Sequence, residues 1–247
     1  MITTPGAAPA PSLDGVTAVV TGASRGIGEA IARALALAGA HVALVARSRE
    51  LLDAVAADIG PRAHAVACDV RDAAAVNEAV VAITAALGES PRLLVNNAGI
   101  FDLAPLAAQS PDAFAATLDA NLVAPFRFVR AFLPAMTAAG RGHIVSIGSI
   151  ADRETFPGNG AYAASKFGAR AMHQVLRAET RGTGVRATLV SPAATDTTLW
   201  DSVGADGSSG LPTRDQMLRP DDVARAVLFA ATQPPHVTVD ELRLSRS

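Results

Sequence analysis

Short apolar segments alternate with longer amphipathic segments along most of the chain, and this alternation constrains the fold more than any other feature. The first apolar segment, Val16–Val20, is followed by an alanine-rich amphipathic stretch from Gly26 to Ala38, and the same order then recurs. Continuous apolar runs are typical of strands that are buried on both faces, as in a parallel sheet. We therefore predict an α/β fold with a doubly wound parallel sheet of about seven strands and helices on both faces.

The same patterns predict the individual elements and one domain. The expected strands are Val16–Val20, His41–Val45, Ala63–Ala67, Leu93–Val95, His143–Ile147, Val185–Val190 and Val237–Leu244. The expected helices are Gly26–Ala38, Arg49–Ile59, Ala73–Leu87, Pro111–Ala138, Ala161–Thr180 and Asp221–Ala231. Pro125 and Pro134 should bend or end the fourth helix. Residues 13–247 should form the domain after a flexible tail over residues 1–12, with a mobile, glycine-rich loop at about 195–217.

Composition excludes several classes of function. The net charge of −2 over 247 residues provides no basic field for nucleic acid. No apolar stretch approaches the roughly 20 residues that span a bilayer, and Met1–Ser12 lacks the basic start and apolar core of a signal peptide. The single cysteine, Cys68, favours a reducing compartment. We expect a cytoplasmic protein that binds neither nucleic acid nor membrane and has no metal site.

A glycine-rich loop stands between the first expected strand and the first expected helix. Glycines permit a tight turn there and let a diphosphate approach the backbone N–H groups at a helix N-terminus. The spacing is G-x-x-x-G-x-G rather than the broader dinucleotide fingerprint. A purely structural turn is the alternative, but the position after the first strand favours a nucleotide. The expected contacts are Gly22, Ser24, Arg25, Gly26, Ile27 and Gly28.

The end of the second expected strand indicates which dinucleotide is bound. Sites selective for NAD place an acidic side chain there, on the ribose 2′-hydroxyl. Here the sequence is Val45-Ala46-Arg47-Ser48, with no carboxylate before Glu50. Arg25 and Arg47 can both pair with a 2′-phosphate. Two exposed arginines are the alternative interpretation, but the missing acid favours NADP(H) over NAD(H).

The chain has one tyrosine and one lysine, and they stand four residues apart in an expected helix. Tyr162 and Lys166 therefore share a helix face. Lys166 is the one lysine among 21 basic residues, and the other 20 are all arginine. An ammonium beside a phenol stabilises the phenolate and lowers the pKa of the phenol, so that it can exchange a proton with a substrate. A surface pair worth a few tenths of a kcal/mol is the alternative. We expect Tyr162 to be the acid or base of a reaction.

Ser149 follows the fifth expected strand and should lie at the same sheet edge as the glycine-rich loop. Its hydroxyl can donate to a substrate oxygen as charge builds there. A turn serine is the alternative interpretation.

Together these residues resemble the motifs of the short-chain dehydrogenase/reductase family. The family's T-G-x-x-x-G-x-G is Thr21–Gly28 here, its N-N-A-G is Asn96–Gly99, and its Y-x-x-x-K is Tyr162–Lys166. The resemblance extends from Leu13 to the end of the sequence, and several independent motifs in the right order make it specific. It implies one Rossmann-type domain and an oxidoreductase similar to 3-oxoacyl reductases.

The resemblance also implies roles for single residues. Asn121 would hold a water in a proton relay, Ser149 would polarise the carbonyl, and Lys166 would also hold the nicotinamide ribose. Asp69 and Val70 would contact the adenine. Further cofactor contacts implied by the family are Asn96, Ala98, Gly99, Pro192, Thr195 and Thr197.

Two departures from the family pattern stand out. Ala193 replaces a glycine that usually follows Pro192, so a position tolerant of unusual backbone angles is lost and the cofactor could shift slightly. Thr197 still matches the threonine that grips the nicotinamide carboxamide. The stretch Val237–Ser247 lacks the common Gly-Gly, and so is similar to a branch in which some members act on small polar hydroxy acids and aldehydes.

Substrate contacts are expected from the segments after Gly99, Ser149 and Thr197. These segments supply Phe101, Leu103, Arg153, Phe156, Leu199 and Trp200. An apolar wall with Arg153 at its mouth would suit a ketone with an acidic or polar tail. A solvated Arg153 is equally compatible with the sequence, as are packing or subunit-contact roles for Phe101 and Trp200.

Three functions follow from the sequence. The first is an NADPH-linked reductase of a ketone or aldehyde, for example a 3-oxoacyl thioester. The second is a dehydrogenase that oxidises a small secondary alcohol or hydroxy acid, and the third is a binding protein that keeps the fold without catalysis. Family resemblance further implies a homodimer or homotetramer paired through the long helices that begin near Pro111 and Ala161.

Overall fold

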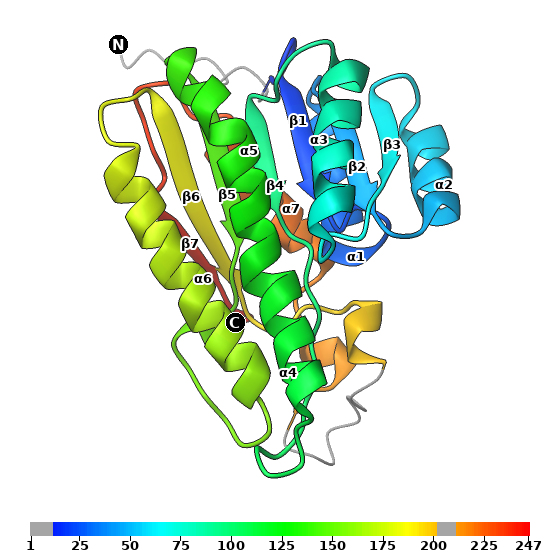
Figure 1. Ribbon diagram of the computed structural model, residues 1–247, viewed down its shortest axis with the longest axis vertical. Helices are drawn as coiled ribbons and strands as arrows, with labels where there is room; N and C mark the ends of the chain where they lie inside the picture. The colour runs from blue at the N-terminus through cyan, green and yellow to red at the C-terminus, as the bar shows by residue number, and fades with distance from the viewer. Residues whose placement is uncertain (1–11, 202–210) are drawn as a thin grey trace, which may run out of the picture.

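Seven strands form one parallel sheet in the computed structural model, which describes residues 12–201 and 211–247 (Figure 1). The strands are β1 (Thr17–Thr21), β2 (His41–Ala46), β3 (Ala63–Ala67), β4 (Leu93–Asn96), β5 (Gly142–Ile147), β6 (Val185–Pro192) and β7 (Glu241–Leu244). Their order is β3-β2-β1-β4-β5-β6-β7. The order reverses between β1 and β4, so a ligand crevice is expected beyond the carboxyl ends of these strands. The predicted doubly wound parallel sheet is confirmed.

Helices cover both faces of the sheet. The first face carries α1 (Gly26–Leu37), α2 (Arg49–Ile59) and α7 (Pro220–Ala231). The second carries α3 (Ala73–Leu87), α5 (Ala124–Ala138) and α6 (Gly160–Glu179), with α4 (Pro111–Leu118) running into α5 (Figure 1). No helix in the described part of the chain is long and apolar enough to span a bilayer.

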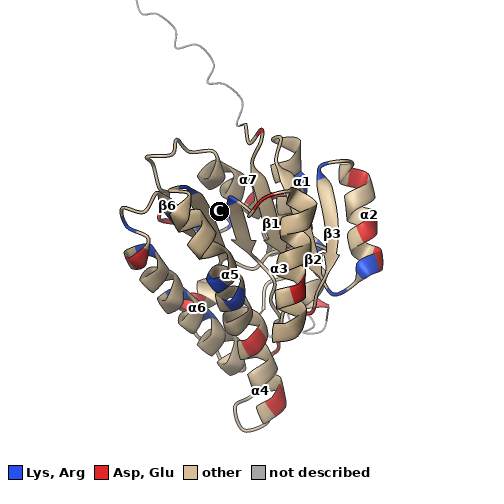
Figure 2. Cartoon of the chain, turned by 45° about the horizontal axis from the view of Figure 1, so that its top comes forward, with Lys and Arg blue, Asp and Glu red and all other residues tan. Residues whose placement is uncertain are grey.

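Alternating side chains of each inner strand enter two separate cores. In β1, Ala18 and Val20 pack under α1 and α7, whereas Val19 packs toward α3 and α5. β1 to β5 carry no Asp, Glu, Lys or Arg, so the charged side chains lie on the helices, the connecting segments and the last two strands, β6 and β7 (Figure 2). Burial on both faces explains the continuous apolar runs of the sequence.

The long helix expected over Pro111–Ala138 is continuous but changes its winding. A π-helical turn, η1 (Asp119–Val123), joins α4 to α5, and the Ala124 N–H donates to the carbonyl oxygen of Asp119. Pro125 follows directly and has no N–H to continue regular α-helical bonding. Pro134, by contrast, lies inside α5 without ending it.

Two other predictions need adjustment. β7 begins at Glu241 rather than Val237, because only Glu241–Leu244 pairs with β6. The described parts of the expected loop at 195–217 contain two 3-10 turns, η3 (Thr198–Trp200) and η4 (Arg214–Gln216). Arg214 ties them together through ion pairs with Asp196 and Asp201. Residues 1–11 of the expected tail and residues 202–210 of the loop lie outside the described residues.

Two histidines, His143 on β5 and His173 on α6, are buried, and each has a hydroxyl group beside one ring nitrogen. His143 Nε2 lies 2.8 Å from Thr188 Oγ1, and His173 Nδ1 lies 2.9 Å from Ser146 Oγ. Burial lowers the pKa of His143 to about 3 and that of His173 to about 4, with smaller contributions from nearby arginines. Both rings are therefore neutral near neutral pH.

We expect the free energy of unfolding to fall as the pH drops from about 6.5 toward 4, because unfolded histidines take up protons that these two refuse in the folded chain. The loss should reach up to about 1.4 kcal/mol per pH unit for each histidine. Urea unfolding across this range measures it. His173→Gln should flatten the slope and the exposed His236→Gln should not, so equal slopes in the two variants would contradict the assignment.

Candidate active site

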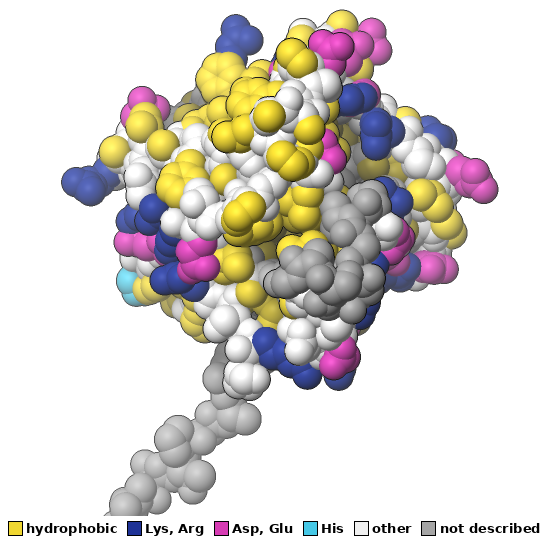
Figure 3. Space-filling view, turned by 90° about the horizontal axis from the view of Figure 1, so that it is seen from below, with side chains coloured by type: hydrophobic (Ala, Val, Ile, Leu, Met, Phe, Trp, Pro, Cys, Tyr) yellow, Lys and Arg dark blue, Asp and Glu magenta, His cyan; other side chains and the backbone are white. Residues whose placement is uncertain are grey.

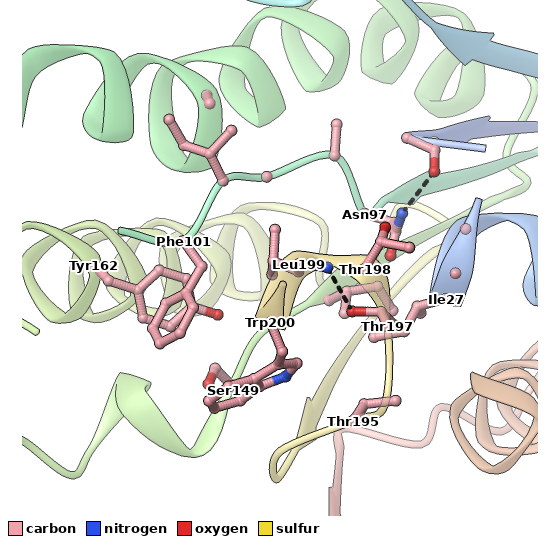
Figure 4. A pocket seen from close by; sticks show the side chains of 18 of the residues that line it. Ile27, Asn97, Phe101, Ser149, Tyr162, Thr195, Thr197, Thr198, Leu199 and Trp200 are labelled. Atoms are coloured by element: carbon pink, nitrogen blue, oxygen red, sulfur yellow. Dashed lines mark hydrogen bonds between the residues drawn. The ribbon is translucent and has the colours of Figure 1, made fainter. Parts of the chain in front are cut away.

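A cavity of about 1220 Å³ opens at the carboxyl edge of the sheet and is lined by segments that follow β1 to β6. It contains most of the expected site residues, some of which are drawn in Figure 4. The expected residues that line it are Gly22, Ser24, Arg25, Gly26, Ile27, Gly28, Arg47, Asp69, Val70, Ala98, Gly99, Phe101, Leu103, Ser149, Phe156, Tyr162, Lys166, Pro192, Thr195, Thr197, Leu199 and Trp200. The expected residues Asn96, Asn121 and Arg153 do not line it.

The glycine-rich loop folds so tightly that side chains do not fit at two of its positions. Gly22 has φ +69°, and a Cβ there would lie 2.9 Å from the Ala98 Cα. A Cβ on Gly28 would lie 2.2 Å from the carbonyl oxygen of Gly22. The first turn of α1 also has no side-chain cap, since Arg25 at the N-cap makes no such bond. N–H groups at a helix start, beside glycines that leave the backbone open to close approach, fit a diphosphate.

The floor of the cavity is fastened by one hydroxyl group. Thr21 Oγ1 accepts hydrogen bonds from the backbone N–H groups of Asn97 and Ala98, each at 3.0 Å. Asn97 Nδ2 in turn donates to the Thr21 carbonyl oxygen at 2.9 Å. Asn97 lines the cavity, whereas the expected Asn96 is a buried residue at the end of β4, in register with Ser146 of β5. Adjacent side chains of an extended segment point to opposite sides, so only one of the two asparagines can face the cavity, and the packing of β4 in the sheet decides which.

Three arginines surround the end of the cavity next to β2 and β3. Arg25 and Arg47 were expected there, and Arg71 was not. Arg71 Nη2 lies 2.8 Å from Asp69 Oδ2, and this hydrogen bond lowers the pKa of the Asp69 carboxyl to about 2. Cys68 also lines this end, and burial raises the pKa of its thiol to about 11, so it stays protonated.

α6 brings the tyrosine and the lysine into the opposite end of the cavity. Lys166 is buried, at 8% exposure, and its Nζ donates to the Ile147 carbonyl oxygen at 3.0 Å. The same Nζ lies 5.6 Å from the centre of the Tyr162 ring. Ser149, at the end of β5, accepts a hydrogen bond from the Ala151 N–H at 3.1 Å and lines the same wall.

Asn121 lies in the π-helical turn and fastens the neighbouring loop. Its Oδ1 accepts from the Ile100 N–H at 2.8 Å, and its Nδ2 donates to the Ile100 carbonyl oxygen at 3.0 Å. Nδ2 also lies 3.0 Å from Ser165 Oγ on α6. The amide therefore fixes the segment that leads to Phe101.

Arg153 does not stand at the mouth of the cavity, because a buried carboxylate holds it elsewhere. Asp152 is fully buried, and its Oδ1 lies 3.0 Å from Arg153 Nε. Asp152 Oδ2 accepts from Ser191 Oγ at 2.6 Å, and Arg153 also pairs with Glu241 on β7. A buried carboxylate needs such partners, so the arginine is drawn away from the cavity.

Ala193 causes no backbone strain in place of the family's glycine. Among the described residues, no non-glycine residue has positive φ. The Ala193 N–H donates to the Leu244 carbonyl oxygen at 2.8 Å, and its carbonyl accepts from Thr195 Oγ1 at 3.0 Å. The expected shift of the cofactor therefore has no cause in backbone strain at this position.

Comparisons with known proteins agree on one family. The family model described as short chain dehydrogenase matches residues 16–207. D-threitol dehydrogenase from Mycolicibacterium smegmatis is 40% identical, over 89% of this chain and 87% of that protein. Glycine betaine reductase ATRR from Emericella nidulans is 41% identical over 93% of this chain, which spans only 18% of that protein. A solved metagenomic short-chain oxidoreductase in complex with NADP has a TM-score of 0.81 at 38% identity, covering 95% of this chain and 99% of that one.

Arg153→Ala should reduce the free energy of unfolding by about 3–5 kcal/mol, since Asp152 is left as an uncompensated buried charge. Arg243→Ala is the matched control, because the Arg243 side chain is 57% exposed and its Nη2 lies 3.8 Å from Glu154 Oε1. That exposed pair should contribute about 0–1 kcal/mol. Urea unfolding measures both, and similar losses in the two variants would contradict the structural role of Arg153.

Proposed function

The chain belongs to the short-chain dehydrogenase/reductase family, and we propose that it reduces a ketone or an aldehyde to the alcohol with NADPH. As a family member it is an oxidoreductase that uses a nicotinamide cofactor and acts on small molecules. The observation that carries the proposal is that Ser149, Tyr162 and Lys166 line the same cavity as the glycine-rich loop. A 3-oxoacyl thioester is one ketone within this proposal.

The residues of the cavity suit a dinucleotide along its whole length. The start of α1 and the loop from Gly22 would hold the diphosphate, and Asp69 and Val70 would contact the adenine. Thr197, which caps η3, would contact the nicotinamide end together with Pro192 and Thr195. When bound, the reduced nicotinamide supplies a hydride to the carbonyl carbon.

Tyr162 would supply the proton that completes the reduction. Its hydroxyl would protonate the substrate oxygen as negative charge develops there, and the Ser149 hydroxyl would donate a hydrogen bond to the same oxygen. The Lys166 ammonium would stabilise the phenolate that remains. Because its Nζ is buried and bonded to the Ile147 carbonyl oxygen, the charge is held beside the phenol. In the reverse direction the phenolate would remove the proton of an alcohol.

Three arginines of the cavity support a preference for binding NADP(H) over NAD(H). Arg25, Arg47 and Arg71 line the end of the cavity next to β2, and no carboxylate follows β2 before Glu50. The nearby Asp69 carboxylate is offset by its ion pair with Arg71. A 2′-phosphate would therefore meet net positive charge.

The second candidate is oxidation of a small secondary alcohol or hydroxy acid, which the relative named D-threitol dehydrogenase favours. Turnover in both directions with matched substrates separates the two. A non-catalytic binding protein is disfavoured, because the serine, tyrosine and lysine would then share the cavity without purpose.

We further propose a homodimer or homotetramer that assembles through α5 and α6. These helices expose Phe126 (50%), Phe167 (42%) and Val175 (56%) to solvent. The single cysteine, Cys68, agrees with the cytoplasmic location that we propose. A monomer by light scattering would contradict the assembly.

Tyr162→Phe should lower kcat by about 100-fold or more, because the proton donor is lost while the ring is kept. The Kd for NADPH should stay within about 3-fold, since the hydroxyl adds at most one hydrogen bond there. Stopped-flow turnover and fluorescence titration measure the two quantities. Unchanged turnover in a folded variant would remove Tyr162 from the reaction and support the binding-protein alternative.

Arg47→Ala should raise the Kd for NADPH about 10-fold or more and leave the Kd for NADH unchanged, because a charge-assisted contact to the 2′-phosphate is lost. Arg49→Ala is the matched control, since Arg49 pairs with Asp53 at 2.8 Å and does not line the cavity. Equal affinity of the unaltered protein for NADPH and NADH would contradict the preference.

A further inference from the structure

The substrate end of the cavity is walled by apolar side chains from the segments that follow β4, β5 and β6. In Figure 4, Phe101, Trp200 and Ser149 lie near Tyr162 at one end, while Ile27, Thr195 and Thr197 lie toward the glycine-rich loop. The apolar members of this wall are Phe101, Leu103, Phe156, Pro157, Leu199, Trp200, Leu211 and Pro212.

Aromatic rings form the part of the wall next to the phenol. The Phe101 ring stands edge-on to Tyr162, with centroids 4.7 Å apart and an angle of 74°. The ring centroid of Trp200 lies 5.1 Å from that of Phe101. Phe101 is buried at 9% exposure, whereas Phe156 is 38% exposed. The inner part of the wall is thus already packed, and Phe156 keeps apolar surface that a ligand can cover.

Charged side chains of the cavity gather at its other end. Arg25, Arg47, Asp69 and Arg71 all follow β1, β2 or β3. Among the described residues of the substrate end, Lys166 alone is charged, and its Nζ is bonded to the Ile147 carbonyl oxygen. In Figure 3, hydrophobic side chains gather over the upper and middle part of the described surface, with charged side chains on either side of them.

Among the residues that the structure describes on this wall, an acidic tail on a substrate would therefore find no free cation. The arginine expected to serve it, Arg153, is held by Asp152 and Glu241 outside the cavity. A carboxylate that leaves water without gaining a partner binds poorly, and so does a chain of hydroxyl groups. An apolar ring loses nothing on leaving water and gains contacts with the aromatic wall.

We infer that the substrate is an uncharged ketone, or the matching secondary alcohol, with one apolar substituent about the size of an aromatic ring. This inference rests on the proposed function, because it takes the reacting oxygen to lie at Ser149 and Tyr162. The apolar substituent packs against Phe156 and Trp200.

Three carbonyl compounds test the inference with NADPH: acetophenone, para-acetylbenzoate and dihydroxyacetone. The first two differ only by a carboxylate. We expect kcat/KM for acetophenone to exceed both other values about 100-fold or more. Equal or faster reduction of para-acetylbenzoate or dihydroxyacetone overturns the inference and leaves the proposed function standing, since a carbonyl is still reduced.

Tryptophan fluorescence tests whether the apolar wall binds a ligand in the absence of turnover, because Trp200 is the only tryptophan of the chain. Cyclohexanol should change the tryptophan emission saturably, and D-threitol at the same concentrations should not. A saturable change with D-threitol, or none with cyclohexanol, overturns the inference. If cyclohexanol binds but no carbonyl is reduced by NADPH-loaded protein, the proposed function fails and the apolar site stands.

Two substitutions at Phe156 connect the wall to specificity. Phe156→Ala should lower kcat/KM for acetophenone about 10-fold or more without changing the Kd for NADPH. Phe156→Arg should raise the rate with para-acetylbenzoate relative to acetophenone by about 10-fold, since the carboxylate gains a partner. Phe229→Ala is the matched control, because Phe229 is 53% exposed on α7 and outside the cavity. If both alanine variants behave alike, Phe156 takes no part in binding the substrate and the inference fails.

Discussion

Parallel pairing of every strand places all seven carboxyl ends along one edge of the sheet, and the site depends on this arrangement. A parallel strand reaches its neighbour only through a crossover, which the helices supply here. Segments that are distant in the sequence therefore meet at one cavity. The hydrogen bond from the Asn97 N–H to Thr21 Oγ1 joins residues 76 positions apart in the sequence. It forms part of the floor of the cavity, at the point where the strand order reverses.

The two ends of the cavity rely on different physical effects. The end next to the glycine-rich loop offers backbone N–H groups, close approach and arginine side chains, which suit phosphate groups. The end next to α6 offers rings and aliphatic side chains around the Tyr162 hydroxyl. A charged cofactor and an apolar substrate can thus share one cavity without competing for the same contacts.

Buried polar groups in this protein are held by specific partners rather than by solvent. Asp152 needs Ser191 and Arg153, and its burial keeps that arginine from the substrate. The Lys166 ammonium is held by a backbone carbonyl, which keeps its charge close to the phenol. The buried, neutral histidines His143 and His173 have hydroxyl partners. Each of these groups makes the fold sensitive to the loss of one contact.

The sequence by itself determined the alternation of strands and helices, the glycine-rich loop and the shared helix face of Tyr162 and Lys166. These features follow from residues near one another in the chain, because apolar periodicity and helical spacing are local. Only the tertiary structure decided that Asn97 and not Asn96 lines the cavity, and that Arg71 joins the other arginines there. It also decided that Arg153 is held outside the cavity, because its partner Glu241 lies 88 positions away in the sequence. Such pairings depend on which strands become neighbours in the sheet, and no local pattern in the sequence encodes that distance.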